Sequence, residues 1–224
     1  MDDDGLPVPE PGVVHLWLRE TGDVSGSPDA PDLLDADERA RAARFRRDRD
    51  RDRYIGSHLL LRRVLARYAG QPPEALRFTR QPCPCCGEPH GRPALAGPAG
   101  LPQFSLSHAG PLTLVAVACD PVGADVEALP AADSVPGLAR VLHPDEQAEL
   151  EQAGFGAEAF ARLWTRKEAY LKGTGSGLGR DPKLDYVGDR KPGPVGWTLA
   201  DAVAPPGFAA AVALRSHTLL LDPR

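Results

Sequence analysis

The sequence predicts an α+β protein in which two similar α/β halves form one pseudo-two-fold unit within a single chain. Two observations support this fold class. The expected elements follow the order strand, helix, strands and then helix, strands, and no long linker separates the two runs. We therefore expect a first half over 1–119 and a second half over 120–224, packed as one compact unit with a ligand site in the cleft between them.

The first half begins with a strand over 13–18, where apolar and polar residues alternate. A helical region is expected from about 33 to 68, with one break. Proline and glycine are too frequent over 71–103 for anything but loop with short strands. Three short strands follow over 104–129, because Ala-Gly-Pro and Asp-Pro-Val-Gly turns divide this apolar stretch.

The second half begins with a helix at Pro144, since proline suits the first helical turn and the acidic residues after it complement the positive end of the helix dipole. A second helix starts near Phe160 and is expected to end at Gly173. Short strands are predicted over 195–200, 207–214 and 217–222.

Composition describes a soluble globular chain with a sizeable core. The 224 residues are 42% hydrophobic, and the mean hydropathy is −0.30. No window approaches the roughly 18 apolar residues of a membrane helix. The start, MDDDGLPVPEPG, is acidic where a secretory signal is basic and then apolar. We predict a cytoplasmic protein without a membrane partner.

The helix near residue 160 carries charge on its apolar side. Lys167 falls within the apolar sector of the helical wheel, Glu168 lies at its edge, and Lys172 follows one turn later. Buried charges are costly unless they have partners or a function. We expect Lys167 to pack its stem there and to direct its ammonium to a neighbouring acid or phosphate.

Two carboxylates of the second half share one strand face. Asp125 and Glu127 are two residues apart, so their side chains leave the same side of the strand. Both could simply face solvent at the end of an edge strand. Glu168 supplies a third carboxylate, and an oxygen-only site of this kind suits Mg²⁺, which shares its coordination with substrate phosphates. The pattern favours an enzyme that acts on a phosphate ester or pyrophosphate.

The segment FSLSHAG places polar groups near a turn. Adjacent residues on a strand point in opposite directions, so Ser107 and His108 are a poor nucleophile and base pair. The hydroxyl and the imidazole could instead hold a phosphate. An ordinary surface histidine is the alternative.

The segment CPCCGEPHG contains three of the four cysteines of the chain. Cys83 and Cys86 have the spacing of half a zinc site, and His90 follows four residues later. A closed structural site requires four ligands, however. Cys85 would be strained beside Cys86, and Cys119 is expected on a distant strand. We favour a tight turn with free thiols over zinc.

Eleven arginines lie between residues 35 and 70, including the run RFRRDRDRDR. This run could bind nucleic acid, but its alternating aspartates neutralise half of the charge and no aromatic residues are interleaved for base stacking. We favour a solvated helix face without a nucleic-acid partner. One or two of the arginines could still serve a bound anion.

Four motifs, GRPAL, FSLSHAG, VGADVEAL and FARLWTRKEAYLKGTGSGLG, occur in this order. Together they resemble the 4′-phosphopantetheinyl transferases of the larger, Sfp-like type over residues 35–179. The resemblance implies two α/β halves with the active site between them. It also implies Mg²⁺-dependent transfer of the phosphopantetheine arm of coenzyme A, the co-substrate, to a serine of an acyl or peptidyl carrier protein, with release of 3′,5′-ADP.

The resemblance also implies roles for particular residues. Asp125, Glu127 and Glu168 resemble the ligands of Mg²⁺, or alternatively Mn²⁺. Glu168, directly or through a metal-bound water, is the base for the carrier serine, and Lys172 steadies the pyrophosphate and the departing 3′,5′-ADP.

Further residues resemble the coenzyme pocket of this family. Ser107 and His108 match a pair that contacts the coenzyme phosphates, and Arg92 stands where the family has lysine. Arg53 is similar to a basic residue of the family's coenzyme pocket, and Arg41 is a second candidate for such a residue. Glu38 departs from the pattern, because a lysine is expected there.

The family also implies a role in secondary metabolism, and a chain with two halves can complete its cleft as a monomer. Two other functions fit parts of the pattern. Another Mg²⁺-dependent phosphotransferase would use the same carboxylates without a carrier protein. A zinc-stabilised nucleic-acid module would leave the three carboxylates unexplained.

Overall fold

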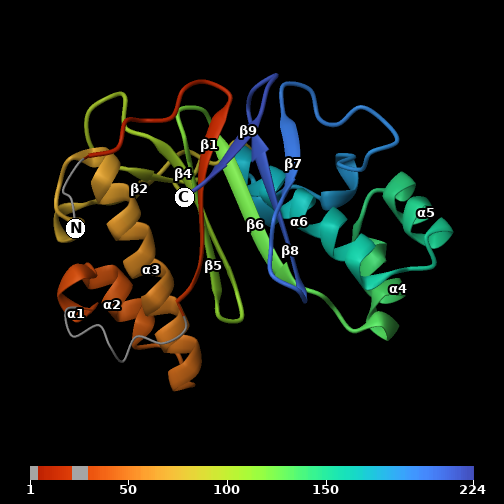
Figure 1. Cartoon of the computed structure of the whole chain (residues 1–224), viewed down its shortest axis with the longest axis horizontal. Helices are drawn as coiled ribbons and strands as arrows, with labels where there is room; N and C mark the ends of the chain where they lie inside the picture. Colours follow the sequence, from red (N-terminus) through yellow and green to blue (C-terminus); the bar gives the residue numbers. More distant parts are fainter. Residues whose placement is uncertain (1–4, 22–29) are drawn as a thin grey trace.

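The first half of the chain is organised around a four-stranded sheet with the order β4-β5-β1-β9, as seen in a computed structural model that describes residues 5–21 and 30–224 (Figure 1). Strand β5 pairs antiparallel with both β4 and β1, and β9 pairs parallel with β1. The strands are β1 Val13–Glu20, β4 Gln103–Ala109, β5 Leu112–Ala118 and β9 Leu220–Pro223.

Helix α3, Asp48–Ala69, covers one face of this sheet (Figure 1). Its buried Leu61, Val64 and Leu65 pack against Trp17 and Val115 of the strands. The predicted helical region is present and breaks once, between α2, Ala36–Ala42, and α3, while a short helix α1, Ala30–Leu33, precedes it. A small hairpin of β2, Phe78–Arg80, and β3, Pro93–Leu95, follows.

The second half has an antiparallel sheet with the order β6-β8-β7, covered by helix α6 (Figure 1). Ala169 and Leu171 of the helix pack against Ala211 and Ala213 of β8. The elements are β6 Val122–Ala128, α4 Val135–Leu138, α5 Pro144–Gln152, α6 Ala157–Thr174, β7 Thr198–Ala202 and β8 Phe208–Leu214. Short 3₁₀ turns lie at 73–75, 132–134, 139–141, 177–179 and 182–184.

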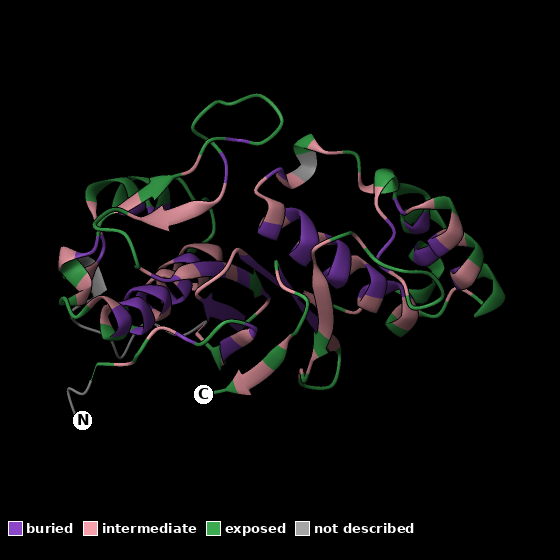
Figure 2. Cartoon of the chain, turned by 90° about the horizontal axis from the view of Figure 1, so that it is seen from above, coloured by how far each residue is buried: buried purple, intermediate pink, exposed green. Residues whose placement is uncertain are grey.

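The two sheets share one apolar core. Leu16 and Leu114 of the first sheet belong to the same buried cluster as Val126 and Val212 of the second. Figure 2 shows buried residues running through the interior of both halves. The α+β architecture with one long helix over each sheet confirms the predicted fold class.

The last strand returns to the first half. Because β9 pairs with β1 in parallel, the end of the chain belongs to the sheet of the first half, although it follows β8 in sequence. The domain division at 119/120 thus describes the order of the elements along the chain, and as a boundary between two halves it stays a prediction.

Glycine allows α6 to lie very close to β6. A Cβ at Gly123 would come 1.9 Å from the carbonyl oxygen of Ala169, and one at Gly173 would come 3.1 Å from the backbone nitrogen of Gly123.

The prediction that α6 ends at Gly173 is wrong. The helix continues to Thr174 and is terminated by Gly175, whose φ of 81° is left-handed.

Among the described residues, none of the helices combines the length and apolarity needed to cross a bilayer.

Candidate active site

The predicted carboxylates and lysine converge where β6 meets α6. Asp125 and Glu127 lie two residues apart on β6, and Glu168 and Lys172 lie one turn apart on α6. The close packing of helix on strand brings these side chains within electrostatic reach of one another. Ser107 joins them from β4, which belongs to the first half. The site is thus assembled from both halves.

Asp125 is the most buried of the three acids, with 1% of its surface exposed. Its Oδ1 accepts hydrogen bonds from Ser107 Oγ at 2.8 Å and from Lys172 Nζ at 2.6 Å. Its Oδ2 is buried and has no hydrogen-bond partner within the described parts of the chain. Burial raises the pKa of Asp125 even though Lys172 and Ser107 oppose the shift. An unpaired buried carboxylate oxygen is costly, so a cation at this position would stabilise it.

Glu127 and Glu168 add negative charge beside Asp125. Burial, and then the neighbouring Asp125 and Glu168, raise the pKa of Glu127 to about 7. Burial and Asp125 likewise raise the pKa of Glu168. Three partly desolvated acids face one lysine, so the cluster carries excess negative charge that a divalent cation would neutralise. The oxygen-only donor set fits Mg²⁺.

Lys172 connects the acids to the polar end of β4. Its Nζ donates to Ser107 Oγ at 2.9 Å as well as to Asp125. His108 follows Ser107 on the exposed side of β4. Partial desolvation, and then the Lys172 ammonium, lower the pKa of His108. In this structure Ser107 therefore bonds the carboxylate and the lysine, while His108 faces solvent beside them.

The remaining predicted basic residues line the first half. Arg92 packs against Gly175 at the end of α6 and donates to Gln81 Oε1 at 2.7 Å. Arg41 on α2 lies over the ring of Tyr54 at 5.7 Å and acts electrostatically on His108. Arg53 on α3 is paired loosely with Asp50, at 3.9 Å. Of these arginines, Arg41 acts on His108, the neighbour of Ser107, whereas the ion pair of Arg53 is with Asp50 on its own helix.

An apolar pocket of about 350 Å³ lies beside Glu127. The end of β6 and one side of α6 form two of its walls, and the segment around α4 forms the third. Its apolar lining residues are Ala128, Pro130, Leu138, Val141, Phe160, Ala161 and Trp164.

Comparison with known proteins decides the family. A model described as 4′-phosphopantetheinyl transferase superfamily matches residues 121–202, and one described as 4′-phosphopantetheinyl transferase, N-terminal, matches residues 28–120. The 4′-phosphopantetheinyl transferase HetI of Nostoc sp. is 31% identical over 222 residues, covering 90% of this chain and 87% of HetI. The chain belongs to the 4′-phosphopantetheinyl transferase superfamily.

Two further relatives support this assignment. The slr0495 protein of Synechocystis sp. is 32% identical over 178 residues, covering 77% of this chain and 67% of that protein. A 4′-phosphopantetheinyl transferase of Bacillus subtilis is 28% identical over 147 residues, covering 65% of this chain and 62% of the relative. The prediction of a phosphopantetheinyl transferase is confirmed, while the roles of individual residues stay predictions.

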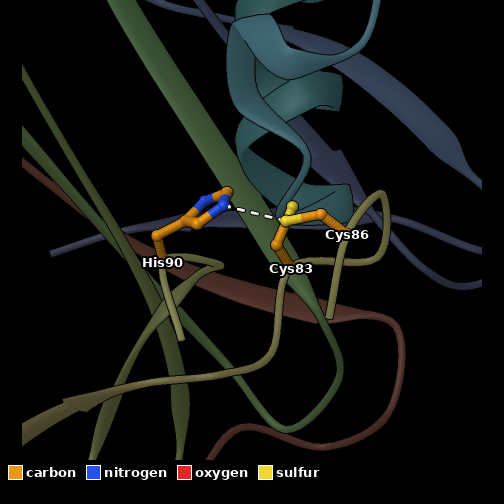
Figure 3. A group of neighbouring side chains, drawn as sticks. All are labelled: Cys83, Cys86 and His90. Atoms are coloured by element: carbon orange, nitrogen blue, oxygen red, sulfur yellow. Dashed lines mark hydrogen bonds between the residues drawn. The ribbon is translucent and has the colours of Figure 1, made fainter. Parts of the chain in front are cut away.

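The cysteine loop of the transferase gathers three potential metal ligands. The ligand atoms of Cys83, Cys86 and His90 all lie within 4.8 Å of one another (Figure 3). All four cysteines are free thiols. Both the favoured turn with free thiols and the alternative of zinc are compatible with this arrangement.

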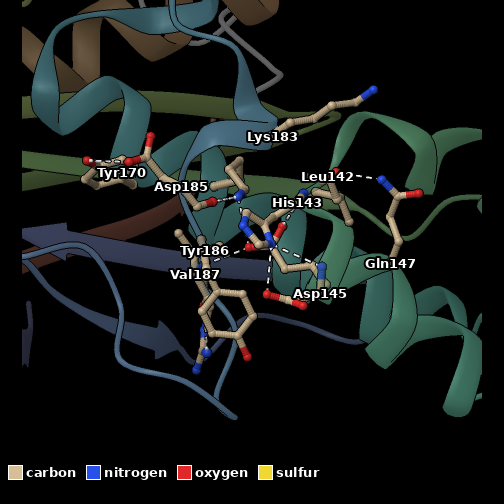
Figure 4. Close-up of polar contacts among 12 residues, drawn as sticks. Leu142, His143, Asp145, Gln147, Tyr170, Lys183, Asp185, Tyr186 and Val187 are labelled. Carbon is tan, nitrogen blue, oxygen red and sulfur yellow. Dashed lines mark hydrogen bonds and ion pairs between the residues drawn. The ribbon is translucent and has the colours of Figure 1, made fainter.

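Lys167 of the transferase is a structural residue. Its fully buried ammonium donates to Glu146 Oε1 at 2.9 Å and to the carbonyl oxygen of Asp185. Glu146 also accepts from the backbone nitrogen of Val187 at 2.6 Å and from that of His143 at 2.9 Å. Figure 4 shows how the segment bearing Asp185 and Val187 lies against the start of α5. The prediction that Lys167 turns to a neighbouring acid is confirmed.

Sequence reasoning missed two basic neighbours of the transferase site. Arg215, directly after β8, lies close enough to Arg92 to lower its pKa after desolvation, so two cations approach each other there. His58 on α3 acts electrostatically on His108. Neither stands in a recognisable motif, and only the packing of distant segments brings them near the predicted residues.

The departure at Glu38 has a structural explanation. Glu38 is buried, and its carboxylate contacts His58 Nδ1 at 2.7 Å and Arg62 Nε at 2.7 Å. Burial raises the pKa of Glu38, but the bonds from His58 and Arg62 outweigh this effect and lower it. Glu38 thus stabilises the packing of α2 on α3.

Proposed function

We propose that this transferase moves the phosphopantetheine arm of coenzyme A to a serine of an acyl or peptidyl carrier protein in a reaction that depends on Mg²⁺ and releases 3′,5′-ADP. The observation that supports it best is the excess of carboxylate at the junction of β6 and α6, including the unpaired Asp125 Oδ2. Asp125, Glu127 and Glu168 would hold Mg²⁺ or Mn²⁺, which would neutralise charge on the coenzyme pyrophosphate.

Glu168 is the proposed base. In the reaction the serine oxygen forms a bond to the phosphorus that carries the pantetheine arm, the bond from that phosphorus to the 3′,5′-ADP oxygen breaks, and the serine proton passes to a carboxylate. Burial and Asp125 raise the pKa of Glu168, which makes its carboxylate a stronger proton acceptor.

Lys172 is the proposed electrostatic partner of the leaving group. Its ammonium lies 2.6 Å from Asp125 Oδ1 and is still partly exposed, with 31% of its side chain accessible. It can therefore exchange this carboxylate for a pyrophosphate oxygen and neutralise the charge that develops on departing 3′,5′-ADP.

The phosphates of coenzyme A would lie along the basic residues of the first half. His108 is exposed, and Arg92 approaches Arg215 at the end of α6, so this edge offers several cationic or hydrogen-bonding groups. Ser107, Arg41 and Arg53 are further proposed contacts. The apolar pocket beside Glu127 offers a surface for the carrier protein segment that brings its serine to the acids.

The test is intact-mass spectrometry of an apo carrier protein incubated with the enzyme, coenzyme A and Mg²⁺, with an EDTA control. We expect the carrier to gain the mass of one phosphopantetheine only when metal is present. Absence of this gain on both acyl and peptidyl carriers, with folded enzyme, would contradict the proposal. Turnover of a nucleotide without any carrier would instead favour another Mg²⁺-dependent phosphotransferase, which the same carboxylates would suit.

Glu168→Gln tests the assignment of the base in the same assay. We expect loss of transfer by about 10²–10⁴-fold, because general base catalysis is removed, with an unchanged melting temperature. Glu158→Gln is the matched control, since Glu158 is exposed on the same helix. Normal activity of Glu168→Gln, or its failure to fold, would refute this role.

The cytoplasmic location, the monomeric state and the link to secondary metabolism stay predictions of the sequence. The ion pairs on α3 weaken the case for a nucleic-acid module, since Arg51 pairs with Asp48 at 2.9 Å and with Asp52 at 3.3 Å and part of the arginine run is thus neutralised.

A further inference from the structure

The loop between β2 and β3 is long and buries little apolar surface. It spans residues 81–92, since Arg80 pairs with Pro93 in the hairpin, whereas hairpin loops usually have about 2–5 residues. Cys83 is buried, but residues 84–90 are all exposed. With so little buried apolar surface, packing alone would stabilise this loop weakly, and a further interaction would be required to fix its conformation.

The backbone nevertheless folds tightly around Cys83. Its nitrogen donates to the carbonyl oxygen of Glu88 at 2.7 Å, and its own carbonyl accepts from Gly87 at 2.8 Å. Gly87 has a φ of 79°, a left-handed conformation that favours glycine. The backbone N–H groups of Cys85 and Cys86 also hydrogen-bond the Cys83 sulfur, so the turn closes around this side chain.

The side chains around this sulfur have the spacing of a metal site. Cys86 Sγ lies 3.0 Å from His90 Nε2, and no pair of ligand atoms in the group with Cys83 is more than 4.8 Å apart (Figure 3). Ligand atoms of tetrahedral zinc lie about 3.5–3.8 Å apart, so small rotamer changes would close the site. Two sulfurs and an imidazole favour zinc over magnesium or calcium.

We propose that Cys83, Cys86 and His90 bind one Zn²⁺ ion, with solvent in the fourth position, and that this ion holds the loop of residues 81–92. Cys85 lies outside the group of three ligands. The site shares no residue with the carboxylate cluster, and we assign it no part in the transfer chemistry. This inference reverses the preference for free thiols that the sequence suggested, because adjacency in sequence did not reveal how the turn wraps around Cys83.

The loop also positions Arg92. A Cβ at Gly91 would come 2.6 Å from the carbonyl oxygen of Gln81, so the chain after His90 is pressed against the start of the loop. Arg92 then bonds the Gln81 side chain and packs on Gly175. Loss of zinc should therefore weaken binding of coenzyme A through Arg92. This consequence, unlike the metal site, rests on the proposed function.

The experiment measures metal content and thiol reactivity of the untagged full-length protein. We expect one zinc per chain by elemental mass spectrometry, and its loss in Cys86→Ser and in His90→Ala. Cys85→Ser and Asp125→Asn are the controls and should keep their zinc. Alkylation mapped by mass spectrometry should spare the exposed Cys86 until a strong chelator is added, while Cys85 reacts throughout. Cobalt substitution should give the thiolate charge-transfer absorption of a tetrahedral site, absent from Cys86→Ser.

Several outcomes would overturn the site. Protein without zinc that does not take it up after reduction, or Cys86 that reacts equally with and without chelator, would show that the loop holds free thiols. Zinc retained in Cys86→Ser but lost in Asp125→Asn would place the ion at the carboxylates. A rise in the KM for coenzyme A without a change in kcat in His90→Ala would support the effect on Arg92. Metal binding without that rise would leave the site standing and refute only its link to the coenzyme.

Discussion

Each half of this transferase buries a cluster of charge, and the two clusters are built in opposite ways. In the first half, fully buried Arg62 lies 2.7 Å from Asp35 and 2.6 Å from Glu38, and His58 completes the pairing of Glu38. In the second half, three acids share one lysine.

The difference appears in the protonation of the acids. Hydrogen bonds outweigh burial at Glu38 and lower its pKa, whereas burial and like charges raise the pKa of Asp125, Glu127 and Glu168. A cluster in which every charge has a partner stabilises the fold. A cluster that leaves the buried Asp125 Oδ2 without a partner stores unfavourable energy that a bound cation can relieve. Charge balance thus separates the structural cluster from the one proposed to be functional.

The largest expected effect is the loss of activity when an acid of the carboxylate cluster is replaced. Asp125→Asn should lower transfer by about 10³-fold, the equivalent of several kcal/mol, because a proposed metal ligand is lost. Its free energy of unfolding should change by less than about 1 kcal/mol, since repulsion among the acids falls as the Lys172 pair is lost. Kinetic assays and urea unfolding measure both quantities. Asp133→Asn, which alters an exposed acid of the same half, should be normal in both. Strong destabilisation by Asp125→Asn would show that this cluster is structural as well.

Arg62→Ala should give the reverse pattern. It leaves Glu38 buried without its cation, so we expect a loss of about 3–5 kcal/mol in the free energy of unfolding. The folded fraction should keep its activity, because the hydrogen bonds of Arg62 are to Asp35, Glu38 and the turn at 73–76 in the first half. Arg63→Ala is the matched control, since Arg63 is the exposed neighbour on the same helix and should cost less than about 0.5 kcal/mol. Equal stability of the two variants would remove the distinction between the clusters.

The smallest expected effect is a pH dependence of the metal-free enzyme. The folded-state pKa of Glu127 is about 7, against an ordinary value of 4.5. Below pH 4.5 the carboxyl of Glu127 is protonated in both the folded and the unfolded protein, so its burial costs no stability there. The cost grows as pH rises to about 7 and is complete above it, at about 1–2 kcal/mol after allowance for solvent screening.

Melting temperatures measured across this range with EDTA should fall more steeply for the wild type than for Glu127→Gln. Added Mg²⁺ should restore the wild type at pH 7, because the cation stabilises the ionised acids. Identical slopes for the two proteins would contradict the assignment of the effect to Glu127.

Local sequence determined much of this protein. Alternation over β1, the turns around β4 to β6 and the start of α5 at Pro144 follow from residue preferences within a few positions, so the order of the elements was predictable. The spacing of Asp125 and Glu127 placed them on one strand face, and the helical period placed Glu168 one turn from Lys172. These relations need only the geometry of one element.

Tertiary structure decided how the helices and strands contact one another. The role of Gly173 depends on its close packing against Gly123 of β6, and the helix instead ends at Gly175 with its left-handed φ. The parallel pairing of β9 with β1 and the burial of Glu38 against Arg62 join segments whose local patterns are independent. The unpaired oxygen of Asp125 is likewise visible only once β4, β6 and α6 are together. Sequence periodicity reports which face of an element is apolar, whereas the partner of a buried charge is set by packing between elements far apart in the chain.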